Sequence, residues 1–401
     1  MKTDLHTAFA GLPAAADAKA IIGKCVHCGF CNATCPTYLE LGDERDGPRG
    51  RIYLIRQLLE SGQASASTRR HLDRCLSCRA CETTCPSGVE YARLADFGRE
   101  ALETRTARTV VDRIRRRALR VTVPHRRRFA AFLRIGQALR PLLPRALGRR
   151  LPARQQRLPV RPATHQRRVV LLDGCAQAAA TPATNDAAAR VLDRLGITAM
   201  RVAGAGCCGA VSYHLSAHDE ARRFIRRNVD ALLPAIDAGA ECIVSSASGC
   251  GVLLRDYGEI MRDDPAYAEP AARVAVLTMD LCELLHKEDL SPLRREGSPS
   301  VALHLPCTLT HGLRCSDLLR EVLQRCGLNL AATRDDHLCC GSAGTYSVLQ
   351  PQMSGRLLDN KLAALSLEQP DCIATANVGC QLHLATRAGV PVRHWIELLD
   401  S

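Results

Sequence analysis

The segments CVHCGFCNATCP (residues 25–36) and CLSCRACETTCP (residues 75–86) carry one cysteine pattern, C-x2-C-x2-C-x3-C-P. This is the bacterial spacing for paired 4Fe-4S clusters, in which the fourth cysteine of each motif ligates the cluster of the other motif. The expected ligands are Cys25, Cys28, Cys31 and Cys85 for one cluster, and Cys75, Cys78, Cys81 and Cys35 for the other. The proline after each fourth cysteine suits the first turn of a helix.

Two other uses of these eight cysteines are less favoured. Structural zinc sites usually carry two separated C-x2-C pairs and not an unbroken triplet. Disulfides require an oxidising compartment, whereas an odd total of 21 cysteines is typical of a reducing one. Because neither a signal pattern nor an apolar run of membrane-spanning length is evident, we expect a cytosolic chain.

The region around the two motifs is expected to be helical. The segment PRGRIYLIRQLLES (residues 48–61) places its aliphatic side chains on one face and is followed by a glycine, which predicts a helix. A further helix is expected over residues 91–109. These features favour a helical ferredoxin domain over residues 1–104. Because the ligands cross between motifs, we expect cluster binding and folding to be one event.

The positive charge is concentrated in a linker expected over residues 105–167. Between Arg105 and Arg168 lie twenty arginines and one acidic residue, about +19, in a chain whose net charge is +13. Apolar residues interleave with arginines from Phe129 to Leu143, which predicts an amphipathic helix. The favoured interpretation is a solvated connector whose apolar face packs on the chain's own domains, and the alternatives are docking on an anionic membrane surface or on an acidic partner. No nucleic-acid-binding module accompanies the charge, so no nucleic-acid partner is expected.

After the linker, strands alternate with helices in two copies, over residues 168–297 and 298–401. The alternation predicts parallel sheets with right-handed crossovers. The separations Cys175 to Cys207 and Cys307 to Cys339 are both 32 residues, which supports a duplication. In the first copy, the fourth strand is expected over residues 272–278. In the second copy, the last helix is expected over residues 395–399.

Each copy carries four cysteines near the carboxyl ends of its strands, where ligands of parallel sheets gather. They are Cys175, Cys207, Cys208 and Cys250 in the first copy, and Cys307, Cys339, Cys340 and Cys380 in the second. A glycine after each adjacent pair permits the backbone bend that both thiols need. A further cluster, a zinc ion, a redox-active thiol pair and inert buried thiols all stay open.

Other cysteines and histidines of this region have simpler interpretations. Five cysteines sit singly in predicted elements and are expected to be small core residues: Cys242, Cys282, Cys315, Cys326 and Cys372. Several histidines lie near strand ends and are interpreted as polar residues with satisfied hydrogen bonds: His304, His311, His337, His383 and His394.

Four stretches resemble the iron-sulfur subunits of flavin-linked oxidoreductases. They are CVHCGFCNATCPTYLELGDERDGPRGRIYLIRQLLE, HLDRCLSCRACETTCPSGVEYARLADFGRE, GCCGAVSYHL and CCGSAGTYSVLQP. The family includes glycolate oxidase, anaerobic glycerol-3-phosphate dehydrogenase, lactate-utilisation proteins and heterodisulfide reductase, and the glycolate oxidase subunits are the most similar. The resemblance covers most of the chain except the linker. It implies an α-helical ferredoxin domain followed by a duplicated α/β region of cysteine-rich CCG type.

The resemblance also implies a role in electron transfer. A separate subunit would carry FAD and oxidise glycolate to glyoxylate, and this chain, with two 4Fe-4S clusters and no catalytic residue, would pass the electrons to a quinone-type acceptor. It would be cytoplasmic, with peripheral contact to the inner face of the cell membrane. The alternatives are a self-contained enzyme like heterodisulfide reductase and an iron-sulfur subunit of a lactate or glycerol-3-phosphate dehydrogenase. Ala247 and Asn377 replace one cysteine of each family CxxC pair, which disfavours a heterodisulfide-type cluster.

Overall fold

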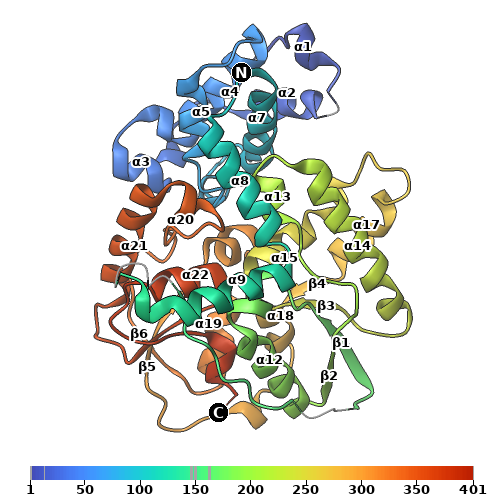
Figure 1. Cartoon of the computed structure of the whole chain (residues 1–401), viewed down its shortest axis with the longest axis vertical. Helices are drawn as coiled ribbons and strands as arrows, with labels where there is room; N and C mark the ends of the chain where they lie inside the picture. Colours follow the sequence, from blue (N-terminus) through green and yellow to red (C-terminus); the bar gives the residue numbers. More distant parts are fainter. Residues whose placement is uncertain (1, 13, 145–147, 149–150, 161–163, 401) are drawn as a thin grey trace.

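The computed structural model describes residues 2–12, 14–144, 148, 151–160 and 164–400. A helical ferredoxin-like unit is followed by two α/β units with parallel sheets, which confirms the predicted fold class. Figure 1 shows the helical unit at the top, the first α/β unit at the lower right and the second at the lower left.

The helical unit is built around α4 (Pro48–Ser61), which has the predicted bounds. Proline at its first turn and Gly62 at its end, with φ of 70°, fix the two termini. Its aliphatic face packs against α2 (Ala15–Lys24) and α7 (Tyr91–Arg105) in a continuous core. The other helical segments of this unit are α1 (Thr7–Ala10), η1 (Phe30–Asn32), α3 (Pro36–Leu41), η2 (Glu44–Asp46), α5 (Ala66–Asp73) and α6 (Ala80–Thr83).

Two helices of the arginine-rich region run across the front of the molecule (Figure 1). The predicted amphipathic helix is α9 (Arg126–Leu139), followed by η3 (Arg140–Leu142), whereas α8 (Val110–Thr122) was not predicted. Arg108 and Arg116 anchor the start of this region to Asp73 of α5, at 2.7 and 3.3 Å. At α9, Arg126 pairs with Asp173 at 3.1 Å. No helix of the described residues is long and apolar enough to cross a membrane.

Each α/β unit contains one four-stranded parallel sheet. The strand orders are β2-β1-β3-β4 and β6-β5-β7-β8. The strands are β1 (Arg167–Leu171), β2 (Ile197–Met200), β3 (Ile243–Ser245), β4 (Thr278–Asp280), β5 (Ser300–His304), β6 (Asn329–Ala331), β7 (Cys372–Thr375) and β8 (Val392–His394). The identical order in both sheets agrees with the predicted duplication.

Helices cover both sheets, and one hydrophobic core runs through both units. The helices of the first unit are α11 (Ala176–Ala180), α12 (Pro182–Arg194), α13 (Ala210–His214), α14 (His218–Asp237), α15 (Ser248–Arg255), α16 (Tyr257–Ile260), α17 (Ala268–Val276) and α18 (Leu281–His286). Those of the second are α19 (Ser316–Arg325), α20 (Tyr346–Leu349), α21 (Pro351–Leu365) and α22 (Val378–Leu384), with the π-helical η5 (Thr308–Leu313). The 3-10 turns are η4 (Ser291–Leu293) and η6 (Trp395–Leu398).

One predicted element is wrong. Residues 272–278 lie mostly in α17, and the fourth strand is the shorter β4. This segment is a short apolar run, whose periodicity does not distinguish helix from strand. The helix expected over residues 395–399 is present as the 3-10 helix η6.

The helical unit docks on the second α/β unit through polar and apolar contacts. The Tyr346 hydroxyl donates to the carbonyl oxygen of Arg74 at 3.0 Å, and the Thr83 hydroxyl lies 2.9 Å from Nδ1 of His311. Leu76 and Cys78 pack in one cluster with residues of α20 and α21. The second cysteine motif is therefore covered by the second α/β unit.

Candidate iron-sulfur sites

The two motif loops share an unusual backbone conformation. His27 and Gly29 in the first loop have positive φ angles of 59° and 85°, and Ser77 and Arg79 at the matching positions have 53° and 63°. A non-glycine residue in this region costs of order 1 kcal/mol or more and persists only where the surroundings impose it. Such turns direct successive backbone N–H groups inward and form anion-binding concavities. Both loops can therefore offer N–H donors to a negatively charged cluster.

The first cavity is lined by cysteines of both motifs. Cys25, Cys28 and Cys31 come from the first motif, and Cys81 and Cys85 from the second. The cavity measures about 420 Å³ up to its open mouth. The four cysteines predicted for one cluster thus surround one space, although they lie up to 60 residues apart in sequence.

The second cavity measures about 360 Å³ with the solvent at its open mouth included, and it also draws on both motifs. It is lined by Cys35 of the first motif and by Cys75, Cys78 and Cys81 of the second. Cys81 reaches the wall of both cavities. The structure brings together the four cysteines predicted for the second cluster, and their role as ligands stays a prediction.

The two cavities differ in exposure. Cys28 of the first cavity is exposed, and next to it Val26 and Phe30 leave 69% and 61% of their surface exposed. In the second cavity, Cys35 and Cys81 are buried. The first cavity therefore faces the surface, whereas the second lies within the helical unit, on the side that packs against the second α/β unit.

Two buried cations lie at the second cavity, Arg51 in its wall and Arg99 behind Cys75. Arg51 is 1% exposed, donates to the Thr37 hydroxyl at 2.9 Å, and places Nη1 3.9 Å from Sγ of Cys35. Arg99 donates to the carbonyl oxygen of Cys75 at 2.8 Å. Although burial opposes the shift, these two guanidinium groups hold the pKa of Cys75 below its usual value. The two cations therefore favour the thiolate form of Cys75 relative to a cysteine without such neighbours.

The other thiols behave differently. Burial raises the pKa of Cys31 to about 11 and the pKa values of Cys78 and Cys81 well above the usual value. These thiols hold their protons until a metal replaces them, so metal loading releases protons.

The cysteines of each α/β unit form a chain of contacts, as predicted. In the first unit, Cys207 contacts Cys175 and Cys208, and Cys208 contacts Cys250. Hydrogen bonds from Cys207 and Cys250 hold the pKa of Cys208 well below its usual value. In the second unit, Sγ of Cys307 lies 3.9 Å from Sγ of Cys339, and Cys340 contacts Cys380.

The glycine after each cysteine pair has the predicted role. Gly209 and Gly341 have φ angles of 98° and 86°. A Cβ atom on Gly341 would lie only 2.6 Å from the carbonyl oxygen of Ser354 in α21. Glycine therefore allows both the bend and the close approach of α21.

Sequence reasoning missed two features of these units. Cys282 and Cys315, expected to sit singly, contact each other with their Sγ atoms 3.7 Å apart. His304, expected to have satisfied hydrogen bonds, has no partner at Nε2 among the described residues. A comparison of the two copies could have revealed His304, because the matching position of the first copy is Leu172.

Comparison with known proteins agrees with this architecture. The "4Fe-4S dicluster domain" family matches residues 21–89, and the "Cysteine-rich domain" family, CCG, matches residues 169–255 and 301–385. Fold and sites thus define an iron-sulfur oxidoreductase subunit with a ferredoxin-like unit and two cysteine-rich units.

Relatives that match the chain over most of its length indicate a more specific family within the iron-sulfur oxidoreductase subunits. The chain is 49% identical to the glycolate oxidase iron-sulfur subunit of Escherichia coli (strain K12), over 100% of this chain and 99% of that protein. It is 30% identical to a probable glycolate oxidase iron-sulfur subunit of Bacillus subtilis (strain 168), over 90% of this chain and 88% of that protein. Lactate utilization protein A of Bacillus licheniformis is 28% identical over 54% of this chain and 91% of that protein. The chain belongs to the family of glycolate oxidase iron-sulfur subunits.

Proposed function

We propose that this chain carries electrons from an FAD-bearing partner, which oxidises glycolate to glyoxylate, to a quinone-type acceptor. The observation that carries the proposal is the pair of neighbouring cavities, each of which brings together the four cysteines predicted for one cluster, drawn from both motifs. Glycolate oxidation delivers two electrons and two protons to the flavin. Each 4Fe-4S cluster accepts one electron at a time, so two clusters can empty the flavin in two steps. The quinone takes up two electrons and two protons.

The ligands in this proposal follow the cavity linings. The first cluster binds Cys25, Cys28, Cys31 and Cys85, and the second binds Cys35, Cys75, Cys78 and Cys81. The domain division stays as proposed from the sequence: the ferredoxin domain over residues 1–104, the linker over 105–167, and the cysteine-rich copies over 168–297 and 298–401.

The exposure of the cavities supports a direction of electron flow. The first cluster would lie at the surface beside the exposed apolar side chains of Val26 and Phe30, which form a contact site for the flavoprotein. The second would lie inside, beside the buried cations Arg51 and Arg99. Nearby positive charge favours the reduced, more negative cluster and raises its reduction potential. Electrons then pass from the first cluster to the second.

The exposed stripe of α8 supports contact with an anionic membrane surface. Val110, Val111, Ile114 and Val121 are exposed and fall on one face of this helix. The exposed arginines 113, 115 and 117 flank that face. Apolar side chains bordered by arginines are typical of helices that lie in the interface of anionic bilayers. The arrangement would hold the complex where quinone is found.

The test uses the assembled complex and the isolated chain, both prepared anaerobically. We expect the isolated chain to bind about eight irons and to oxidise no glycolate. In the complex, Cys78→Ala should leave reduction of the flavin by glycolate intact but abolish reduction of a quinone analogue. Phe30→Glu should slow cluster reduction at least tenfold, whereas Leu367→Glu, at another exposed apolar residue, should not. Glycolate oxidation by the isolated chain, or quinone reduction by the Cys78→Ala complex, would contradict the proposal.

A further inference from the structure

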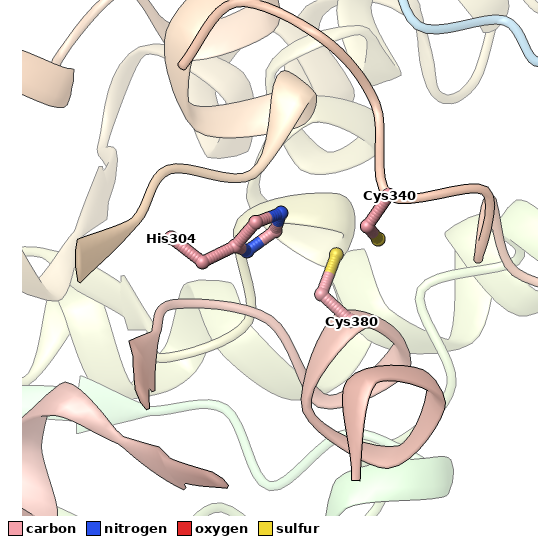
Figure 2. A group of neighbouring side chains, drawn as sticks. All are labelled: His304, Cys340 and Cys380. Atoms are coloured by element: carbon pink, nitrogen blue, oxygen red, sulfur yellow. The ribbon is translucent and has the colours of Figure 1, made fainter. Parts of the chain in front are cut away.

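Three potential metal ligands meet in the core of the second α/β unit. His304 ends β5, Cys340 lies in the loop after β6, and Cys380 lies in α22 after β7. Nε2 or Nδ1 of the histidine and the two Sγ atoms all lie within 4.8 Å of one another. Figure 2 shows the imidazole directed toward the two sulfurs. All three residues are at least 95% buried.

The histidine is oriented for ligation by its neighbour. Nδ1 of His304 lies 2.9 Å from the hydroxyl of Thr375 on the adjacent strand β7. With the proton on Nδ1, the ring donates to Thr375 and turns the lone pair of Nε2 toward the sulfurs. Nε2 has no partner among the described residues. An unpaired buried polar atom destabilises the fold, and a bound ion would give Nε2 a partner.

The first α/β unit provides an internal comparison. When the cysteine pairs are aligned, His304 and Lys361 of the second unit correspond to Leu172 and Val229 of the first. Leu172 and Val229 pack with Cys208 in an apolar cluster. The second unit has replaced these two apolar residues with an imidazole and an ammonium group at the same depth. Polar groups in a core are costly unless they are bonded, so this change points to a ligand in the second unit alone.

We propose that Nε2 of His304 and the Sγ atoms of Cys340 and Cys380 bind one zinc ion. Zinc prefers nitrogen and sulfur donors in tetrahedral geometry, with Zn–S near 2.3 Å, which places two thiolates about 3.8 Å apart. The three ligand atoms lie within 4.8 Å of one another, which is close enough for one ion to bind all three. A cubane holds its thiolates farther apart, because each binds a different iron. This site lies outside the eight cysteines of the cluster motifs.

A buried cation lies beside the site. Lys361 is 3% exposed and donates from Nζ to the carbonyl oxygen of Asp335. A hydrogen bond with Cys340 and the charge of Lys361 lower the pKa of Cys380, but burial and the neighbouring thiols outweigh them and raise it above its usual value. Two thiolates neutralise the ion, and three protein ligands leave a fourth position for water.

The test measures zinc and iron in the untagged chain purified from zinc-supplemented cells. We expect about one zinc per chain in addition to the cluster irons. His304→Leu, which introduces the residue of the first unit, should lose the zinc and keep the iron. Cys380→Ser should also lose it, and Cys250→Ser, the matched change in the first unit, should keep it. Fluorescence of Trp395, the one tryptophan, checks that each variant is folded.

Several results would overturn the proposal. The wild-type protein would contain its full iron but no zinc, or Cys380→Ser would retain the zinc. Cys250→Ser would lose the zinc, or His304→Leu would lose iron beyond that of the two clusters. The zinc count of the wild-type chain decides the matter even if a variant fails to fold. Because zinc and iron are counted separately, a failure here is distinguishable from a failure of the proposed electron-transfer role.

Discussion

Buried histidines join elements that lie far apart in the sequence. His394 is fully buried, and its Nε2 donates to the carbonyl oxygen of Ser246 in the other α/β unit at 2.7 Å. Its Nδ1 accepts from the N–H of Ile396 at 3.3 Å. Both nitrogens are thus used in the neutral form of the ring. Burial lowers the pKa of His394 to about 4, although the bond to Ser246 opposes this shift.

This histidine predicts a loss of stability in mild acid. The unfolded chain binds a proton near pH 6.5, whereas the folded chain does so only near pH 4, so stability falls as the pH drops through this window. The contribution lost at pH 5.5 is about 1.4 kcal/mol. Urea unfolding followed by Trp395 fluorescence at pH 7.5 and 5.5 should show this loss in the wild type and a smaller one in His394→Gln. Equal losses in both proteins would contradict the role of His394.

Sequence spacing identified the cysteines, whereas the histidines were predicted only to have satisfied hydrogen bonds, which is correct for His394 and wrong for Nε2 of His304. The C-x2-C-x2-C-x3-C pattern lies within one short segment of the chain, so both cluster motifs can be recognised from the sequence without a structure. The environments of His304 and His394 depend instead on strands and turns that meet only in the folded chain. Arg51, which places its guanidinium near Cys35, was missed for the same reason.

At the level of elements, local signals decided which predictions succeeded. Helix α4 has a proline at its start, a glycine at its end and an amphipathic pattern between them, and its bounds were predicted correctly. Helix α17 lacks such caps, and its alanine- and valine-rich sequence fits a strand equally well. Helix α8 was missed because its arginines suggested a solvated segment, although Arg116 binds Asp73.

The exposed stripe of α8 predicts membrane binding by the complex. Ile114 is 62% exposed, and burial of such a side chain in a bilayer is worth roughly 1.5–3 kcal/mol. Ile114→Asp should therefore weaken sedimentation with vesicles of anionic lipid at least tenfold. Val276→Asp, at an 84% exposed position on α17, is the matched control and should bind as the wild type does. Equal binding by both variants, or equal wild-type binding to neutral vesicles, would refute the membrane contact.

At the scale of the whole molecule, the fold class and the duplication could be read from the sequence. Strand order and the docking of the helical unit could not, because they depend on contacts between distant segments such as Tyr346 with Arg74. That docking covers the second cavity and leaves the first at the surface. The proposed direction of electron flow therefore rests on tertiary structure and not on the motifs themselves.

Crossed ligation of two clusters is the central claim, and paired cysteine variants test it most directly. Cys25→Ala with Cys85→Ala removes two ligands from one proposed cluster, whereas Cys25→Ala with Cys35→Ala removes one from each. After anaerobic reconstitution, iron and acid-labile sulfide are counted in both double variants. We predict about four irons in the first and close to none in the second. The reverse result, with iron retained in the Cys25/Cys35 variant and lost from the Cys25/Cys85 variant, would show that each motif binds its own cluster and would contradict the account.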